Sequence, residues 1–236
     1  MGLKEKILRQ LKNGLIVSCQ PDENGLFSDV NFIVEFARAS EQGGAVGIRT
    51  EGYENIKAVK EKVNIPVIGL IKAKYPNGDV LITPDFNAVE KIIEAGADIV
   101  AIDVTGREGR YEFFKMVRNE FKDVIFLADI STFEEGVKAF ELGADMIATT
   151  LSGYTSHTKN SFKKYEPDFG LVEQLVKNLS IPVIAEGRIW TVEQAKKMFE
   201  IGAYAVVVGS AITRPRLIVQ RFVEAISNKE LQCEEF

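Results

Sequence analysis

A pattern that occurs three times constrains this sequence most: a helical stretch ends at a glycine and is followed at once by a short apolar run. The copies span residues 90–103, 137–150 and 195–209, with their glycines at Gly96, Gly143 and Gly202. Glycine readily adopts the left-handed conformation that ends many helices. The aliphatic runs lack polar alternation, as in parallel strands covered on both faces. The chain is therefore expected to alternate helices with buried parallel strands.

Further apolar runs extend the alternation to eight strands, two of which open with a proline, Pro66 and Pro182, at the strand entrance. The predicted strands lie at about residues 15–19, 44–49, 66–71, 98–102, 124–128, 145–149, 181–185 and 204–208. Eight strand and helix units in 236 residues predict an α/β fold, a single (β/α)8 TIM barrel over residues 1–236. An open doubly wound sheet is the alternative, but residues 19–25 lack the GxGxxG fingerprint after the first strand.

The two ends of the chain are expected to differ in order. Leu3, Ile7, Leu8 and Leu11 share one face of a leading helix, which we expect to close the bottom of the barrel. The acidic tail from Asn228 is expected to be frayed.

The charge and the apolar runs indicate which partners this chain can have. A net charge of −5 and a pI of 5.2 leave no basic face, so nucleic-acid binding is not expected. No apolar run approaches membrane-spanning length, and the N-terminus lacks a secretory segment. Cys19 and Cys233 are far apart in sequence, which indicates a reduced cytoplasmic chain with Cys19 as a buried small hydrophobe. The expected partners are small molecules.

Polar residues follow seven of the eight predicted strands. In this fold the active-site residues lie at the carboxyl ends of the strands. The residues there are, in order, Gln20, Arg49, Lys72, Asp103, Asp129, Thr150, Glu186 and the pair Gly209–Ser210. Any one of them could pair with a neighbour or cap a helix, but as a ring they predict a functional pocket.

Two glycine-containing segments after the last two strands predict a phosphate site. Backbone N–H groups around Gly187, Gly209 and Ser210 can approach phosphate oxygens at a helix N-terminus. Arg214 offers a planar fork for the same anion, with Pro215 starting the helix behind it. The alternative is that these glycines only make tight turns.

The scarcity of histidine limits the kinds of catalysis that this chain can carry out. His157 is the only histidine and lies in a polar loop, so a histidine-rich metal centre and a Ser-His-Asp triad are not expected. Asp103 and Asp129 could hold Mg²⁺ through water, a reading that stays open. Otherwise proton transfer or Schiff-base chemistry by lysine and carboxylates remains.

Lys72 and Glu186 end the third and seventh predicted strands, so they face one another in a ring of eight. Groups on opposite sides can address opposite faces of one carbon, as epimerisation by deprotonation and reprotonation requires. Burial would raise the pKa of Glu186 and lower that of Lys72, whereas their attraction would do the reverse, and both outcomes stay open.

Six motifs across the barrel resemble those of the bacterial N-acetylmannosamine-6-phosphate 2-epimerases. They are Gly43–Arg49, Ile68–Lys72, Leu127–Thr132, Thr149–Thr155, Ile184–Arg188 and Val208–Pro215. Thr-Thr-Leu-Ser-Gly-Tyr-Thr together with Ala-Asp-Ile-Ser-Thr is specific to that family. The segment Thr50–Gly52 and the loop after Tyr154 depart from the family pattern.

The resemblance implies interconversion of N-acetylmannosamine 6-phosphate and N-acetylglucosamine 6-phosphate in sialic acid catabolism. It implies Lys72 and Glu186 as the acid/base pair, no metal or organic cofactor, and a homodimer. Substrate contacts are implied for Gln20, Arg49, Asp129 and Thr150, and phosphate contacts for Arg214 and the backbone at Gly187, Gly209 and Ser210. The hydrogen on carbon 2 is acidic only beside an aldehyde, so we expect the open-chain sugar to react, with Arg49 or Lys72 stabilising the enediol-like intermediate. A Schiff-base lyase using Lys72, and a sugar-phosphate binder without turnover, are the alternatives.

Overall fold

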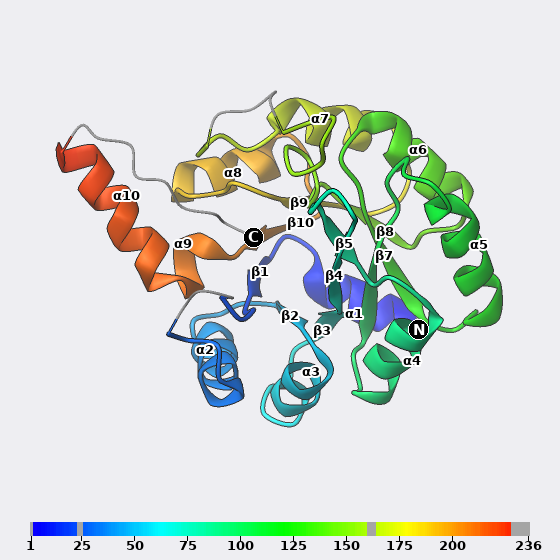
Figure 1. Ribbon diagram of the computed structural model, residues 1–236, viewed down its shortest axis with the longest axis horizontal. Helices are drawn as coiled ribbons and strands as arrows, with labels where there is room; N and C mark the ends of the chain where they lie inside the picture. Colours follow the sequence, from blue (N-terminus) through cyan, green and yellow to red (C-terminus); the bar gives the residue numbers. More distant parts are fainter. Residues whose placement is uncertain (1, 23–25, 160–163, 228–236) are drawn as a thin grey trace.

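Eight parallel strands form a closed barrel with helices around it in the computed structural model, which describes residues 2–22, 26–159 and 164–227 (Figure 1). The strands follow the ring order β1-β10-β9-β8-β7-β6-β3-β2. Their bounds are β1 Leu15–Ser18, β2 Gly47–Glu51, β3 Val67–Leu70, β6 Ile99–Asp103, β7 Ile125–Asp129, β8 Met146–Ala148, β9 Val183–Glu186 and β10 Ala205–Val208. The barrel prediction is confirmed and the open-sheet alternative is wrong.

Helices follow the strands on the outside of the barrel (Figure 1). Their bounds are α2 Val30–Gln42, α3 Tyr53–Lys60, α4 Phe86–Glu94, α5 Arg110–Glu120, α6 Phe133–Glu141, α7 Phe169–Asn178, α8 Val192–Glu200, α9 Ser210–Thr213 and α10 Pro215–Ser227. The three repeated glycines have φ angles of 89°, 90° and 98°, so the predicted left-handed helix ends are confirmed. Predicted and observed strand ends differ by up to three residues, most at β2, which begins at Gly47.

The strands carry apolar side chains on both faces because both faces are covered. In β6, Ile99 and Ala101 pack inside the barrel, whereas Val100 and Ile102 pack against the outer helices. This alternation has a period of two residues, as strand geometry requires. An ionisable residue at the inward position of a strand end therefore points into the mouth of the barrel.

The leading helix α1 (Leu3–Leu11) lies behind the barrel in the view of Figure 1. Ile7 and Leu11 are buried with the residues that fill the barrel interior, and the Tyr204 hydroxyl donates to the Leu8 carbonyl oxygen at 2.9 Å. The predicted closure of the bottom is confirmed for these residues. The prediction is wrong for Leu3, which is 75% exposed because the first turn extends past the apolar interior.

A β-hairpin intervenes between β3 and α4, and the sequence prediction missed it. Its strands are β4 (Lys72–Lys74) and β5 (Val80–Ile82), which pair antiparallel with Lys72 opposite Ile82. Lys72 therefore does not end the third barrel strand, as predicted, but begins this hairpin. The turn contains Asn77-Gly78, which is a typical hairpin signal.

Cys19 is fully buried, and burial raises the pKa of its thiol to about 12, so the prediction of a small buried hydrophobe is confirmed. Cys233 and the tail from Asn228 lie outside the described residues. In the part of the chain that the structure describes, no helix has the length and apolar character needed to cross a membrane.

Candidate active site

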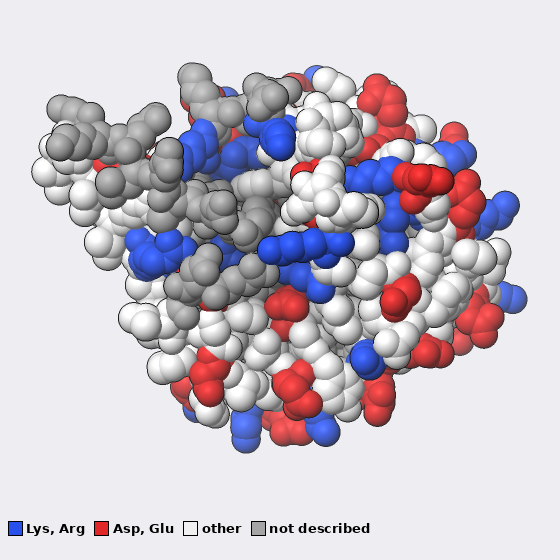
Figure 2. All heavy atoms as spheres, viewed as in Figure 1, with Lys and Arg blue, Asp and Glu red and all other residues white. Residues whose placement is uncertain are grey.

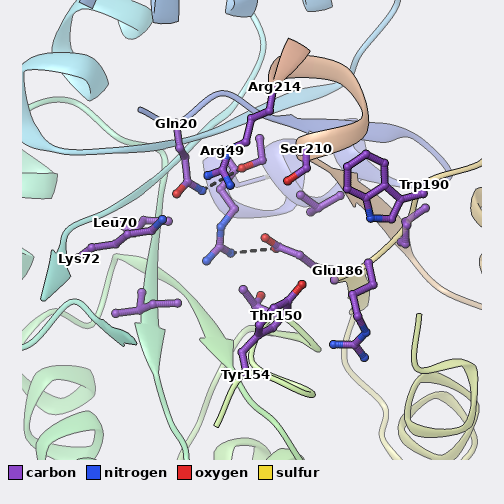
Figure 3. Close-up of a pocket in the computed structure, with 17 residues that line it drawn as sticks. Gln20, Arg49, Leu70, Lys72, Thr150, Tyr154, Glu186, Trp190, Ser210 and Arg214 are labelled. Atoms are coloured by element: carbon purple, nitrogen blue, oxygen red, sulfur yellow. Dashed lines mark hydrogen bonds and ion pairs between the residues drawn. The ribbon is translucent and has the colours of Figure 1, made fainter. Parts of the chain in front are cut away.

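The carboxyl ends of the barrel strands surround a cavity, drawn in Figure 3. Most residues of the predicted ring line it, together with the predicted phosphate residues. They are Gln20, Arg49, Lys72, Thr150, Glu186, Gly187, Gly209, Ser210 and Arg214. The period of two residues along the strands brings Arg49 of β2 and Glu186 of β9 into this mouth.

Asp129 ends β7, is fully buried and does not itself line the cavity. Its carboxylate accepts two hydrogen bonds from Arg49, from Nη1 to Oδ1 at 3.0 Å and from Nη2 to Oδ2 at 2.7 Å. The Thr150 hydroxyl donates to Oδ1 at 2.5 Å. Both oxygens of Asp129 are therefore engaged, and the carboxylate fixes the orientation of the Arg49 guanidinium.

Arg49 lies between two carboxylates. Its Nη1 is 3.2 Å from Oε2 of Glu186, and only 1% of its side chain is exposed. Burial alone would lower the pKa of Arg49, but Asp129 and Glu186 raise it above its ordinary value. Arg49 thus stays a cation at the base of the cavity, and its Nε has no hydrogen-bond partner among the described residues.

Hydrogen bonds fix the backbone of Glu186, and its surroundings shift the pKa of its carboxyl group. The Thr149 hydroxyl donates to the Glu186 carbonyl oxygen at 2.9 Å and accepts from its amide at 3.1 Å. Burial raises the pKa of Glu186 to about 7, although the charges of Arg49 and Lys72 oppose this rise. Of the two outcomes left open for Glu186, burial is therefore the stronger, and the carboxyl group can exchange a proton near neutral pH.

Lys72 reaches the cavity from the side opposite Glu186. In Figure 3 the two side chains point toward one another, with Arg49 between them. The cross-barrel arrangement predicted from the sequence is present, but the hairpin rather than the end of β3 carries the lysine.

Glycines shape the side of the cavity where phosphate was predicted. Gly187 has a φ of +111°, which a side chain would strain. A Cβ on Gly209 would lie 3.1 Å from the Cβ of Ser18, so the backbone approaches β1 closely. Ser210 and Arg214 line the cavity beside these glycines, and α10 begins at Pro215 as predicted.

The cavity is also lined by four polar or aromatic side chains that the sequence prediction did not select: Ser18, Tyr154, Arg188 and Trp190. Arg188 has a φ of +54°, and its guanidinium donates to carbonyl oxygens of Ser152 and Glu166. It thereby ties the segment after β9 to the segment after β8. The family motifs contain Tyr154 and Arg188, but the prediction weighed only residues directly at strand ends.

The hydrogen-bond partners of Asp103 and Asp129 test the alternative of a magnesium site. Asp103 accepts from Thr105, from the Tyr75 hydroxyl at 3.2 Å and from Arg107 at 3.2 Å, and it does not line the cavity. Among the described residues, no three His, Cys, Asp or Glu side chains are grouped closely enough to hold a metal ion. The carboxylates of Asp103 and Asp129 thus have separate sets of protein donors, and neither lines the cavity.

His157 is exposed in its loop, as predicted. Its Nε2 lies 3.3 Å from Oγ of Ser131 and 3.5 Å from Oε1 of Glu135. The imidazole does not line the cavity.

Charge on the surface agrees with an anionic ligand. Figure 2 shows Lys and Arg side chains near the middle of the face that carries the mouth, with many of the carboxylates farther out. A cavity with cationic walls raises the local concentration of an anion.

Comparison with known proteins identifies the family. The model of the family described as "Putative N-acetylmannosamine-6-phosphate epimerase" matches residues 33–228. Two proteins described as "Putative N-acetylmannosamine-6-phosphate 2-epimerase" are similar over nearly their whole length. The one from Caldanaerobacter subterraneus subsp. tengcongensis is 50% identical over 94% of this chain and 95% of its own, and the one from Clostridioides difficile is 44% identical over 93% and 99%.

A solved structure extends the similarity to three dimensions. The N-acetylmannosamine-6-phosphate 2-epimerase from Clostridium perfringens superimposes with a TM-score of 0.86 at 41% identity, covering 92% of this chain and 95% of that one. Sequence and fold therefore agree: the chain belongs to the N-acetylmannosamine-6-phosphate epimerase family.

Proposed function

We propose that this protein interconverts N-acetylmannosamine 6-phosphate and N-acetylglucosamine 6-phosphate by moving a proton at carbon 2, in sialic acid catabolism. Membership of the epimerase family supports the reaction. The observation that carries the mechanism is a carboxyl group with a pKa of about 7, Glu186, facing Lys72 across the cavity. Two proton-transfer groups on opposite sides of one carbon can invert its configuration.

Arg49 is proposed to stabilise the intermediate. Deprotonation beside an open-chain aldehyde places negative charge on the oxygen of carbon 1, and a fixed donor in a buried site lowers the energy of that charge. Arg49 is a buried cation whose orientation Asp129 holds, and its Nε has no partner among the described side chains and backbone groups. We assign Asp129 to orienting Arg49, because both of its carboxylate oxygens accept hydrogen bonds and it does not itself line the cavity.

The remaining cavity residues divide between the sugar and its phosphate. Gln20 and Thr150 lie on the cavity wall near Arg49, where sugar hydroxyl and acetamido groups need polar partners. Arg214, Ser210 and the backbone at Gly187 and Gly209 are proposed to bind the phosphate, which matches guanidinium and N–H donors. This division puts the phosphate at the far end of the substrate from carbon 2.

A homodimer in the cytoplasm is proposed as the working form, with residues 1–236 as one domain. The last helix, α10, exposes four apolar side chains that a second copy could cover: Val219, Phe222, Val223 and Ile226 are 60%, 67%, 43% and 81% exposed. Light scattering of the purified protein tests the dimer. A phosphorylated sugar is charged at neutral pH and does not cross membranes unaided, which favours the cytoplasm.

The direct test is turnover in heavy water. The protein is incubated with N-acetylmannosamine 6-phosphate without added metal, and proton NMR follows the sugar. We expect N-acetylglucosamine 6-phosphate that carries deuterium at carbon 2. Conversion without deuterium would contradict proton exchange with solvent, and the absence of both conversion and exchange would contradict the proposed reaction.

Two variants test the assignment of the acid/base pair. Lys72→Ala and Glu186→Gln are each expected to lower kcat by about 100-fold or more, since general acid–base catalysis contributes about 10² to 10⁴. Near-normal turnover in a folded variant would refute its role. Borohydride treatment with substrate present separates the lyase alternative, because only a Schiff base on Lys72 is trapped as a covalent adduct.

A further inference from the structure

Two segments that are distant in the sequence form adjoining walls of the cavity. The β4–β5 hairpin contributes Lys72 and Ile82, and the segment after β8 contributes Thr150 and Tyr154. These walls meet at Asp79 in the hairpin turn, where the backbone amide of Ser156 donates to Oδ2 at 2.9 Å. Asp79 thus links the wall that carries Lys72 to the wall that carries Tyr154.

The carboxylate of Asp79 accepts hydrogen bonds from several donors. Besides Ser156, Nη2 of Arg107 lies 3.3 Å from Oδ2, and Nδ2 of Asn77 donates to it at 3.2 Å. Only 10% of the Asp79 side chain is exposed. Burial alone would raise its pKa, but the hydrogen bonds from Ser156 and Asn77 and the charge of Arg107 lower it. Asp79 is therefore ionised at neutral pH.

Each wall has further contacts on its own side of this link. Arg107 stacks over the Tyr75 ring at 4.2 Å and donates to the Val80 carbonyl oxygen at 2.9 Å, which holds the hairpin to the loop after β6. In the segment after β8, the hydroxyls of Thr155 and Thr158 are 2.6 Å apart. Because each segment has contacts besides the Asp79 link, including the strand pairing within the hairpin, we expect this link to set their relative position rather than their folding.

We propose that Asp79 is a positioning residue for the reaction, holding the Lys72 wall in register with the wall formed by the segment after β8. The inference rests on the proposed acid/base role of Lys72. Proton transfer depends steeply on the position of the reacting groups, so a displacement of about 1 Å can cost about 100-fold in rate. The phosphate residues Ser210 and Arg214 belong to other strand ends, so substrate affinity depends less on this link.

Asp79→Ala is expected to lower kcat by about 10- to 100-fold and to change KM by less than about threefold. Asp79→Asn keeps an acceptor oxygen for the Ser156 amide and is expected to recover most of the lost kcat. The matched control is Asp85→Ala. Asp85 also accepts a backbone N–H, from Ala88 at 2.9 Å, but it caps α4 outside the cavity.

Asp85→Ala is expected to lower the thermal midpoint while keeping the normal kcat, with all assays run below every variant's midpoint. The inference is overturned if Asp79→Ala keeps normal kcat, or if Asp79→Asn is as slow as Asp79→Ala. Lys72→Ala is assayed in parallel. An inactive Lys72→Ala with a normal Asp79→Ala refutes this inference alone, whereas an active Lys72→Ala refutes the proposed acid/base role and this inference with it.

Discussion

Glu186→Gln is expected to make the protein more stable at alkaline pH while it lowers kcat. Burial raises the pKa of Glu186 from its ordinary 4.5 to about 7, which corresponds to about 3 kcal/mol. The folded protein therefore binds more protons than the unfolded chain between these values, and the free energy of unfolding falls as pH rises through this window. Glutamine resembles the protonated form, so the variant is spared this loss. At pH 8 it should exceed the wild type by about 3 kcal/mol, or about 6 °C in Tm for a chain of this size.

Urea denaturation of both proteins at pH 5, 6, 7 and 8 measures the effect. The two curves should approach one another toward pH 5 and separate by pH 8, with similar slopes in urea. Glu173→Gln is the control, because Glu173 lies on the surface and Lys177 lowers its pKa, so no gain at pH 8 is expected. Parallel pH dependence of the wild type and Glu186→Gln would refute the argument that burial perturbs this carboxyl group.

Three further changes test other parts of the structure. Asp129→Ala should lower the free energy of unfolding by about 3–5 kcal/mol, because it leaves the buried guanidinium of Arg49 without its bidentate partner; urea denaturation measures this loss. Gly69→Ala should cost about 1–3 kcal/mol, since a Cβ there would lie 2.7 Å from Cγ2 of Ile92, whereas Gly170→Ala, where the Cβ has room, serves as a control in thermal denaturation. Arg214→Ala should weaken binding of the phosphorylated sugar by about 10- to 100-fold in calorimetry, as expected for a lost charge-assisted hydrogen bond, and unchanged affinity would contradict its phosphate role.

The sequence predicts those features of the fold that depend on neighbouring residues along the chain. The glycines that end the repeated helices and the aliphatic runs after them predict parallel strands, and the number of such units predicts a closed barrel. Barrel closure then brings the strand ends together, so the sequence predicts Arg49 and Glu186 at one mouth of the barrel. The resemblance of the motifs to the epimerase family implied which reaction these residues carry out.

Local sequence patterns do not predict the contacts between segments that are distant along the chain. No local pattern shows that the carboxylate of Asp129 accepts hydrogen bonds from Arg49, which lies 80 positions earlier. The hairpin that carries Lys72 interrupts an expected strand-to-helix connection, and its link through Asp79 to Ser156 joins positions 77 residues apart. Periodicity reports only which face of an element is buried, not which partner covers it.

The sequence by itself determined the barrel and the set of polar groups at its mouth, because helix ends and buried strands depend on nearby residues. The tertiary structure alone decided the chemical state of those groups. Burial and the negative charge of Asp129 raise the pKa of Glu186, whereas the charges of Arg49 and Lys72 lower it, and each of these contributions depends on distances that only the folded chain defines.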